Sequence, residues 1–375
     1  MNWLKSAGIS IFLLLTAGCE IIPLVGERGP ATGNIPGFFL LNEGNVNSNK
    51  CRLDFYDYAT GVYSKNIFEE RNPELIQGLG DVGNDIAIYG SRIYVAVYGS
   101  NVVEVIDVRT GWHIEQIPVK NCRSITCKGQ YVYVSSYNDS EDLDPGETLG
   151  FVAKIDTCSL EVIDICNVGY QPEEMAIVGE QLYVTNSGIK RAPNYDLSVS
   201  VVDLHIFREI QKIEIAPNLH RMEADAYGKI WVSSRGDHYD IPSMTFVINT
   251  ENNAVCDVLD QLPCSDMALC GDSLYVISNV LNYYTQSSEI QYSIVDVRTH
   301  QVVTNNFITD GTDEQIQNPY GIAVNPNTRE ILVTDARDCI TPGKLYCFSP
   351  QGVLKWSTDT GDIPSRIVFT NTRLL

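Results

Sequence analysis

The sequence has little charge, few basic residues and few histidines. Only 19% of its 375 residues are charged, and 26 Lys and Arg stand against 47 Asp and Glu, which gives a net charge of −21. With 44% hydrophobic residues the chain is too apolar to be disordered, and it can bury a large core. An acidic surface repels phosphate groups, so we expect no nucleic-acid partner.

Beyond the N-terminus no run of residues is long and apolar enough to span a membrane. Residues 1–18 combine a short cationic start, MNWLK, with the apolar stretch GISIFLLLTAG, as export signals do. LTAGC resembles a bacterial lipobox, although Thr16 stands where a branched aliphatic residue is usual. We therefore predict a lipoprotein signal at 1–18, lipidation of Cys19, a tether at 19–36 and one folded domain at 37–375. Ordinary secretion is the alternative.

The remaining ten cysteines contain no C-x-x-C pair, so a zinc knuckle or a redox motif is not indicated. Disulfides are plausible in an exported chain, and buried free thiols are equally compatible with the sequence. Cys158 and Cys166 are spaced to face each other across a hairpin.

Residues 78–83 read GLGDVG, which matches the G-x-G-x-x-G pattern of dinucleotide-binding loops. That pattern binds a pyrophosphate only between a strand and the start of a helix. The residues that follow, NDIAIYGSRIYVAVYG, alternate as strands do. We therefore interpret GLGDVG as a tight turn between strands.

One unit repeats along the chain, and it consists of short strands separated by polar turns. The turn-opening residues recur every 46–53 residues and are of the types whose side chains cap turns; they are Asp57, Asp107, Asp156, Asp203, Asn249, Asp296 and Ser349. Each unit holds four strands, and none has a helical period of helix length. Blades of four strands around an axis define a β-propeller, and the seven turn-opening residues predict that this propeller has seven blades.

The two ends of the chain complement each other. GFFLLNEG at the N-terminus matches the second strand of a unit, and PSRIVFT at the C-terminus matches a first strand. We therefore predict an all-β fold, a seven-bladed β-propeller of four-stranded blades whose first blade is closed by the C-terminal strand. Such closure removes a free sheet edge.

Long loops fall on one face of this propeller, the face where the first strand of each blade begins. We call it the loop face. Its longest predicted loops are 137–150, 187–197, 235–244, 279–290 and 336–344. Loops on a rigid scaffold are where binding residues concentrate. Tyrosine, arginine and asparagine gather there, and the candidate ligand contacts are Asn42, Tyr98, Tyr137, Asn186, Arg235, Tyr239, Asn279, Tyr283, Tyr284 and Tyr320.

Enzyme chemistry has little support in the sequence. Neither G-x-S-x-G nor H-E-x-x-H occurs, and we predict no catalytic residue, no metal site and no cofactor. His220 and His238 could join Asp237 or Glu223 around a metal. The acidic loop 139–147 could bind calcium, although it lacks the spacing of a calcium loop. Carboxylates near the loop face, of the kind that calcium-dependent lactonase propellers use, are Glu43, Asp85, Glu173 and Asp335.

The blade pattern resembles the YncE-like seven-bladed propellers over nearly all of the mature chain. FFLLNEGN, LGDVGNDIAIYGSRIYVAVYGSNVVEVID and the lipobox together are similar to propeller lipoproteins of Bacteroidetes, among them the BtuG-like proteins that capture cobalamin at the cell surface. The resemblance implies an outer-membrane lipoprotein that binds a corrinoid and passes it to a TonB-dependent transporter. In that family several acidic residues usually follow the lipidated cysteine, whereas here only Glu20 does.

Two other functions remain as alternatives. A propeller lipoprotein can serve envelope assembly through protein contacts alone, without a small-molecule cargo. A calcium-assisted, lactonase-like enzyme is the third hypothesis.

Overall fold

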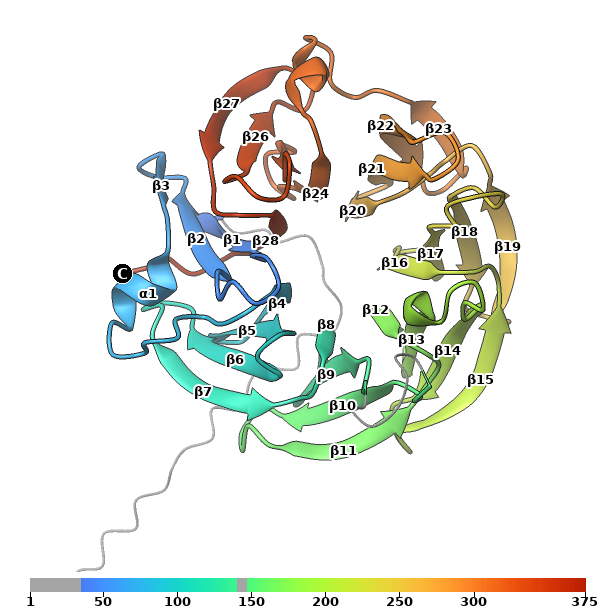
Figure 1. The fold of residues 1–375 in the computed structure, drawn as a ribbon, viewed down its shortest axis with the longest axis horizontal. Coiled ribbons are helices and arrows are strands. Elements are labelled where there is room, and N and C mark those ends of the chain that lie inside the picture. The colour runs from blue at the N-terminus through green and yellow to red at the C-terminus, as the bar shows by residue number, and fades with distance from the viewer. Residues whose placement is uncertain (1–34, 140–146) are drawn as a thin grey trace, which may run out of the picture.

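The computed structural model describes residues 35–139 and 147–375. The predicted signal at 1–18, Cys19, all but the last two residues of the tether at 19–36, and residues 140–146 of the acidic loop lie outside the described residues. Seven four-stranded antiparallel sheets surround a central axis, as Figure 1 shows. This confirms the predicted seven-bladed β-propeller.

Each blade runs from an innermost strand beside the axis to an outermost strand at the rim. In that order, blade one contains β28 (Pro364–Thr370), β1 (Gly37–Asn42), β2 (Arg52–Asp57) and β3 (Val62–Ser64). Blade two contains β4 (Gly83–Tyr89), β5 (Arg92–Val97), β6 (Val102–Asp107) and β7 (His113–Pro118). Blade three contains β8 (Cys122–Lys128), β9 (Tyr131–Ser136), β10 (Phe151–Asp156) and β11 (Val162–Asn167). Blade four contains β12 (Pro172–Val178), β13 (Gln181–Asn186), β14 (Ser198–Asp203) and β15 (Arg208–Glu214).

The remaining blades follow the same order. Blade five contains β16 (Leu219–Ala224), β17 (Lys229–Ser234), β18 (Met244–Asn249) and β19 (Ala254–Leu259). Blade six contains β20 (Asp266–Cys270), β21 (Ser273–Asn282), β22 (Ser287–Asp296) and β23 (Gln301–Thr304). Blade seven contains β24 (Pro319–Val324), β25 (Ile331–Asp335), β26 (Lys344–Phe348) and β27 (Leu354–Asp359).

The helical elements are short. The described residues contain helix α1 (Ile67–Arg71) and the 3-10 turns η1 (Ile189–Arg191) and η2 (Thr312–Gln315). The sequence repeat predicted no helix of ordinary length, and the five residues of α1 are too few to produce a helical period in the sequence. Ile67 and Phe68 are both buried, so α1 attaches the link between blades one and two to the core. No helix among the described residues is long and apolar enough to cross a membrane.

The polar turn residues cap the outer hairpins as predicted. In each blade the turn-opening side chain accepts a hydrogen bond from the backbone N–H two residues on, at distances from 2.7 Å at Asp57 to 3.2 Å at Ser349. Such a bond stabilises the reversal of the chain locally. Seven equivalent caps explain why the repeat is visible in the sequence.

The C-terminal strand closes the ring. β28 pairs antiparallel with β1, from Gly37 opposite Thr370 to Asn42 opposite Pro364. GLGDVG also has the structure that its surroundings predict, because β4 begins at Gly83 and no helix follows. Gly80 has a φ of 113°, and an added Cβ would lie 2.5 Å from Ser100 Oγ. This position therefore needs glycine.

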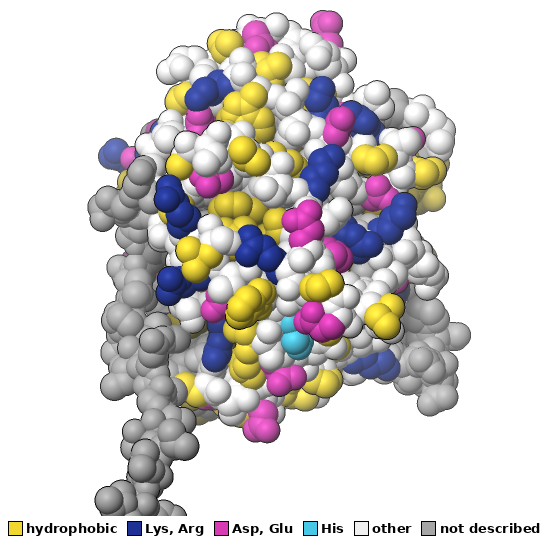
Figure 2. Space-filling model, turned by 90° about the vertical axis from the view of Figure 1, so that its left-hand side faces the viewer, with side chains coloured by type: hydrophobic (Ala, Val, Ile, Leu, Met, Phe, Trp, Pro, Cys, Tyr) yellow, Lys and Arg dark blue, Asp and Glu magenta, His cyan; other side chains and the backbone are white. Residues whose placement is uncertain are grey.

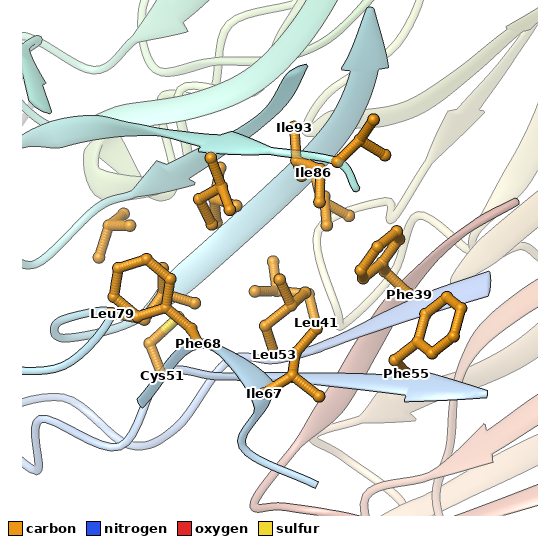
Figure 3. Packing of buried hydrophobic residues seen from close by; sticks show 14 residues of the cluster. Phe39, Leu41, Cys51, Leu53, Phe55, Ile67, Phe68, Leu79, Ile86 and Ile93 are labelled. Atoms are coloured by element: carbon orange, nitrogen blue, oxygen red, sulfur yellow. The ribbon is translucent and has the colours of Figure 1, made fainter. Parts of the chain in front are cut away.

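The core lies between neighbouring blades. Figure 3 shows one such cluster, to which β1 contributes Phe39 and Leu41, β2 contributes Leu53 and α1 contributes Phe68, while Ile86 and Ile93 come from blade two. The outer surface is mixed in character. Figure 2 views the molecule from the side, with apolar side chains scattered among Lys, Arg, Asp and Glu. On this side the net charge of −21 does not produce a uniformly acidic surface.

Candidate functional site

The innermost strands carry irregularities near the loop face that direct side chains to the axis. The pairing register shifts within β4, β8, β12, β16 and β24, in each case just after the first residue of the strand. A β-bulge inserts an extra residue and re-aims its side chain. Polar residues from several blades therefore meet where the strands converge in Figure 1.

Two arginines and two carboxylates from four blades form a ring, which we call the axial ring. Arg221 Nη1 lies 2.7 Å from Glu174 Oε1, and Arg221 Nε lies 3.0 Å from Asp266 Oδ1. Arg366 pairs with Glu174 and, at 3.2 Å, with Asp266. Burial alone would raise the pKa of Glu174, but the two guanidinium groups outweigh it and lower that pKa. The axial ring therefore joins blades one, four, five and six by charge.

Glu174 and Asp266 of the axial ring, together with Asp85 of blade two, also link three blades to the blades that follow them. Asp85 accepts the backbone N–H of Ile125 at 2.7 Å, Glu174 that of Met222 at 2.8 Å, and Asp266 that of Ile322 at 2.9 Å. In all three cases the N–H belongs to the first residue after the bulge of the following blade. These carboxylates are committed to the scaffold, which leaves them little capacity to bind an ion.

A second group, which we call the mouth group, contains Glu173, Arg123, Arg235 and Tyr137. Arg123 Nη2 lies 2.9 Å and Arg235 Nη1 lies 3.5 Å from the carboxylate of Glu173. Tyr137 donates its hydroxyl to the same carboxylate. Burial raises the pKa of Glu173, but the two arginines and the tyrosine outweigh burial and lower it to about 2. Glu173 is thus a charged, saturated anchor and not a proton-transfer group at neutral pH.

This predicts a specific dependence of stability on pH. Glu173 keeps its charge down to about pH 2 in the folded state, whereas its ordinary value in an unfolded chain is 4.5. The stability advantage of the wild type over Glu173→Gln should therefore be complete above about pH 4.5 and shrink as the pH falls towards 2. Urea denaturation at pH 7, 5 and 3 measures it. A constant difference across this range would contradict the pairing.

Aromatic rings extend the mouth group towards solvent. The rings of Tyr98 and Tyr137 lie 6.1 Å apart, and the Arg123 guanidinium lies 4.7 Å from the centre of Tyr137. Lys190 Nζ lies 3.1 Å from the Tyr98 hydroxyl and pairs with Asp139. Cations over tyrosine faces are held by the ring quadrupole. The ring of Tyr137 is already covered by this contact, whereas Tyr98 is only half-buried.

Glu43, Tyr320 and His220 face the same axial region. Tyr320 donates its hydroxyl to Glu43 at 2.9 Å, and burial raises the pKa of Glu43 despite that bond. Burial lowers the pKa of His220 well below its usual value, and the nearby arginines lower it further. His220 is therefore neutral at pH 7, and its Nδ1 has no hydrogen-bond partner among the described residues.

An exposed aromatic cluster lies over blades five and six. Tyr239 is 48% exposed, Tyr283 45% and Tyr284 67%. The ring of Tyr239 lies 5.4 Å from that of Tyr283 and 5.1 Å from that of Tyr284. None of the three hydroxyl groups forms a hydrogen bond within the described part of the chain. We call these three residues the tyrosine cluster.

The segment that carries Tyr283 and Tyr284 differs from the prediction. Residues 279–290 were predicted as a long irregular loop, and that prediction was wrong. β21 and β22 stay paired from Ser273 opposite Asp296 to Asn282 opposite Ser287, so only a four-residue turn remains. The backbone bonds of this hairpin hold the two tyrosines more firmly than a loop would.

The predicted site residues therefore fall into separate places. Tyr239, Tyr283 and Tyr284 come together in the tyrosine cluster, whereas Tyr98, Tyr137, Arg235 and Tyr320 line the axial mouth. Asn42 and Asn186 are fully buried: Asn42 donates to Asp54 at 3.0 Å, and Asn186 to Ser200 at 2.9 Å. Asn279 is half-buried and donates to Asn318 at 2.7 Å. Because their amides bond within the protein, these three asparagines are not among the ligand contacts that we propose.

The axial ring itself was missed from the sequence, although a signal for it exists. In every blade two residues at or just before the start of the innermost strand's regular pairing precede an Ile or Met. These pairs are Asn84-Asp85, Arg123-Ser124, Glu173-Glu174, His220-Arg221, Ser265-Asp266, Tyr320-Gly321 and Ser365-Arg366. The second residues of these pairs supply all four members of the axial ring. Aligning the repeats on this Ile or Met shows that the four residues occupy equivalent positions in their blades.

Potential metal ligands do not gather in the described residues. No group of three or more His, Cys, Asp or Glu there is arranged to hold an ion. Asp335 accepts three backbone N–H groups instead, those of Gln317, Asn318 and Arg337. His113 pairs with Glu104 and His300 with Asp257, beside the outer hairpins.

The cysteines are largely reduced in this structure. Among the described residues nine thiols are free, namely Cys51, Cys122, Cys127, Cys166, Cys256, Cys264, Cys270, Cys339 and Cys347. Cys166 is among them, so the suggested pairing with Cys158 is not formed.

Comparisons with known proteins identify the family and the fold. The model of a family described as a domain of unknown function (DUF5074) matches residues 36–349. Kuenenia stuttgartiensis hydrazine synthase is similar in structure, with a TM-score of 0.59, 15% identity, and 86% of this chain and 99% of that chain covered. A quinoprotein alcohol dehydrogenase-like protein from Bacteroides thetaiotaomicron gives 0.57 and 15%, with 89% and 78% covered. At this identity the likeness shows the fold alone. No curated protein matches the sequence.

Proposed function

The chain belongs to the DUF5074 family, and on that premise we propose that it is a lipid-anchored binding protein that captures a corrinoid such as cobalamin on its loop face. The observation that carries the proposal is the tyrosine cluster. Three exposed rings, of which that of Tyr239 lies 5.4 Å and 5.1 Å from the other two, offer stacking and, through their unused hydroxyl groups, hydrogen bonding to a broad ligand.

Because ion pairs close the central axis, we place the ligand on the surface of the loop face and not inside the channel. The axial ring and the mouth group fill the channel entrance with ion pairs, which a ligand would have to break in order to enter. Corrinoids are broad and amphipathic, with an apolar macrocycle and many amide groups. A face held by paired strands and buried ion pairs would bind such a ligand with little ordering cost on the protein side.

The proposal includes a location and a transfer step. We propose that Cys19 carries the lipid, that the protein sits at the outer-membrane surface, and that a TonB-dependent transporter receives the corrinoid. In this scheme the protein binds its cargo and catalyses no reaction on it. The resemblance of FFLLNEGN and the lipobox to cobalamin-capturing lipoproteins supports this part of the proposal.

Isothermal titration of the purified protein with cyanocobalamin tests the function. Saturable binding with one ligand per chain is the expected result. The absence of heat, together with the absence of co-eluting cobalamin in gel filtration, would exclude corrinoid capture.

A double substitution, Tyr283→Ala with Tyr284→Ala, should weaken cyanocobalamin binding by at least about tenfold, because each ring supplies a large contact area. Tyr227→Ala is the matched control. Tyr227 is also 48% exposed, but it lies in the turn between β16 and β17 on the opposite face. The proposed site would be refuted if both variants bound as tightly as the wild type.

One observation favours a protein partner as the second candidate. The tyrosine cluster continues into exposed aliphatic side chains on the same loop and hairpin, Ile241, Leu281 and Ile290, each between 37% and 39% exposed. Exposed apolar groups beside tyrosines are typical of interface cores. A capture assay against outer-membrane proteins, using the double tyrosine variant as the negative control, would distinguish envelope assembly from corrinoid capture.

A further inference from the structure

A polar hollow lies on the loop face of blade seven, away from the tyrosine cluster. Its volume is about 470 Å³, within the range of small-molecule sites. Residues of η2, of the link between η2 and β24, of the end of β25, of the 336–343 loop and of β26 surround it. Those that matter here are Gln315, Gln317, Arg337, Thr341, Lys344 and Tyr346.

Most charged groups in the wall of the hollow are already paired. Asp335 accepts three backbone N–H groups at 2.8–3.1 Å. Asp338 accepts the N–H of Ile340 and both the N–H and the hydroxyl of Thr341. Arg337 Nη2 lies 3.0 Å from Asp359. The hydrogen bonds hold both carboxylates in place without neutralising them, and Arg337 is balanced by its ion pair with Asp359.

Lys344 is different. Its Nζ lies 5.0 Å from the centre of the Tyr346 ring, and it forms no ion pair or hydrogen bond with any residue that the structure describes. The side-chain amides of Gln315 and Gln317 are likewise unused within 35–139 and 147–375. The hollow thus presents one uncommitted positive charge beside two uncommitted carboxamides.

A buried hydroxyl in the core cluster that also contains Tyr346 lacks a partner among the described residues. Tyr292 is 3% exposed, and its hydroxyl forms no hydrogen bond with them. Burial raises the pKa of Tyr292, and Asp335 and Tyr346 in the wall of the hollow raise it further, as groups close to the phenol do. A buried polar group without a partner is costly, and an ordered water would satisfy it.

We propose that this hollow binds a small saccharide that carries one carboxylate, such as a uronic acid. Lys344 would pair with the carboxylate, while Gln315 and Gln317 would accept and donate hydrogen bonds to the hydroxyl groups. Apart from Tyr346 the residues named in the wall are polar, which suits a hydroxyl-rich ligand and not an apolar one. The net charge of −21 opposes anions at long range, but at 0.15 M salt it is screened beyond about 8 Å.

Titration of the full chain with glucuronate, glucose and inorganic phosphate at 0.15 M salt tests the proposal. We expect saturable binding of glucuronate, with glucose and phosphate at least about tenfold weaker, since one lacks the charge and the other the hydroxyl pattern. The substitution Lys344→Met should lower the affinity for glucuronate at least about tenfold. Lys120→Met, an exposed lysine before β8, should not change it.

Each other outcome would overturn the proposal. It fails if glucuronate does not bind, if glucose or phosphate binds as tightly, or if Lys344→Met binds like the wild type. Gln317→Ala provides a second variant at an exposed position. It should weaken the binding of both sugars and leave the binding of phosphate unchanged. Cyanocobalamin binding should be the same in Lys344→Met and the wild type, so failure of this inference is distinguishable from failure of the proposed function.

Discussion

Arg366→Met is expected to lower the free energy of unfolding by about 3–5 kcal/mol, the range observed when one partner of a buried ion pair is removed. Arg366 contacts Glu174 and Asp266, whose side chains are 13% and 2% exposed. After the substitution only Arg221 remains between those two carboxylates. Their buried negative charge is then under-compensated, which destabilises the folded state. The shift of the urea denaturation midpoint measures the loss.

Two further variants calibrate this result. Arg366→Lys keeps a positive charge but cannot contact both carboxylates with a planar fork, so its cost should be intermediate. Arg298→Met removes an exposed pair, 3.9 Å from Asp272, and should change stability by less than about 0.5 kcal/mol. If Arg366→Met were as stable as Arg298→Met, the axial ring would not hold the blades together.

Truncation after Asp362 is expected to abolish the soluble monomer. The truncated chain lacks β28, so β1 keeps β2 as its neighbour but loses its other partner along its whole length and becomes an edge strand. Phe38 and Leu40, both fully buried, pack in a cluster that also includes Ile367 and Phe369 of the lost strand. An exposed hydrophobic edge strand pairs readily with other chains. Gel filtration with light scattering should detect aggregates in place of a monomer.

A chain that ends at Thr372 is the matched control for that truncation. It retains all of β28 and loses only the last three residues, of which Leu374 is packed against the core of blades one and two. It should remain monomeric, with a modest loss of stability. A monomeric, cooperatively unfolding chain that ends at Asp362 would show that ring closure is dispensable.

Much of the fold could be predicted because its signals are local. A turn needs a capping side chain two residues before the bonded N–H, so the Asp57-type positions repeat with the blades. The unmatched first strand at Pro364 and second strand at Gly37 fix where the ring closes. GLGDVG could be interpreted correctly because the alternation of the residues after it excludes a helix.

The site could be predicted only in part. Tyr283 and Tyr284 were assigned to the loop face, but the pairing of β21 with β22 that presents them is a tertiary outcome. Asn186 was assigned to the same face, yet it turns inward to Ser198 and Ser200. Asn186 ends its strand, and the sequence alone does not say on which side of the sheet such a terminal side chain finds its partners.

The sequence by itself therefore determined the number of blades, the turn chemistry and the closing strand, because each depends on neighbours along the chain. Only the tertiary structure decided which polar residues converge. Glu174, Arg221, Asp266 and Arg366 are separated by up to 192 residues, and they meet because the innermost strands of four blades converge on one axis. The curvature of seven packed sheets places them there, and no local pattern of residues encodes that curvature.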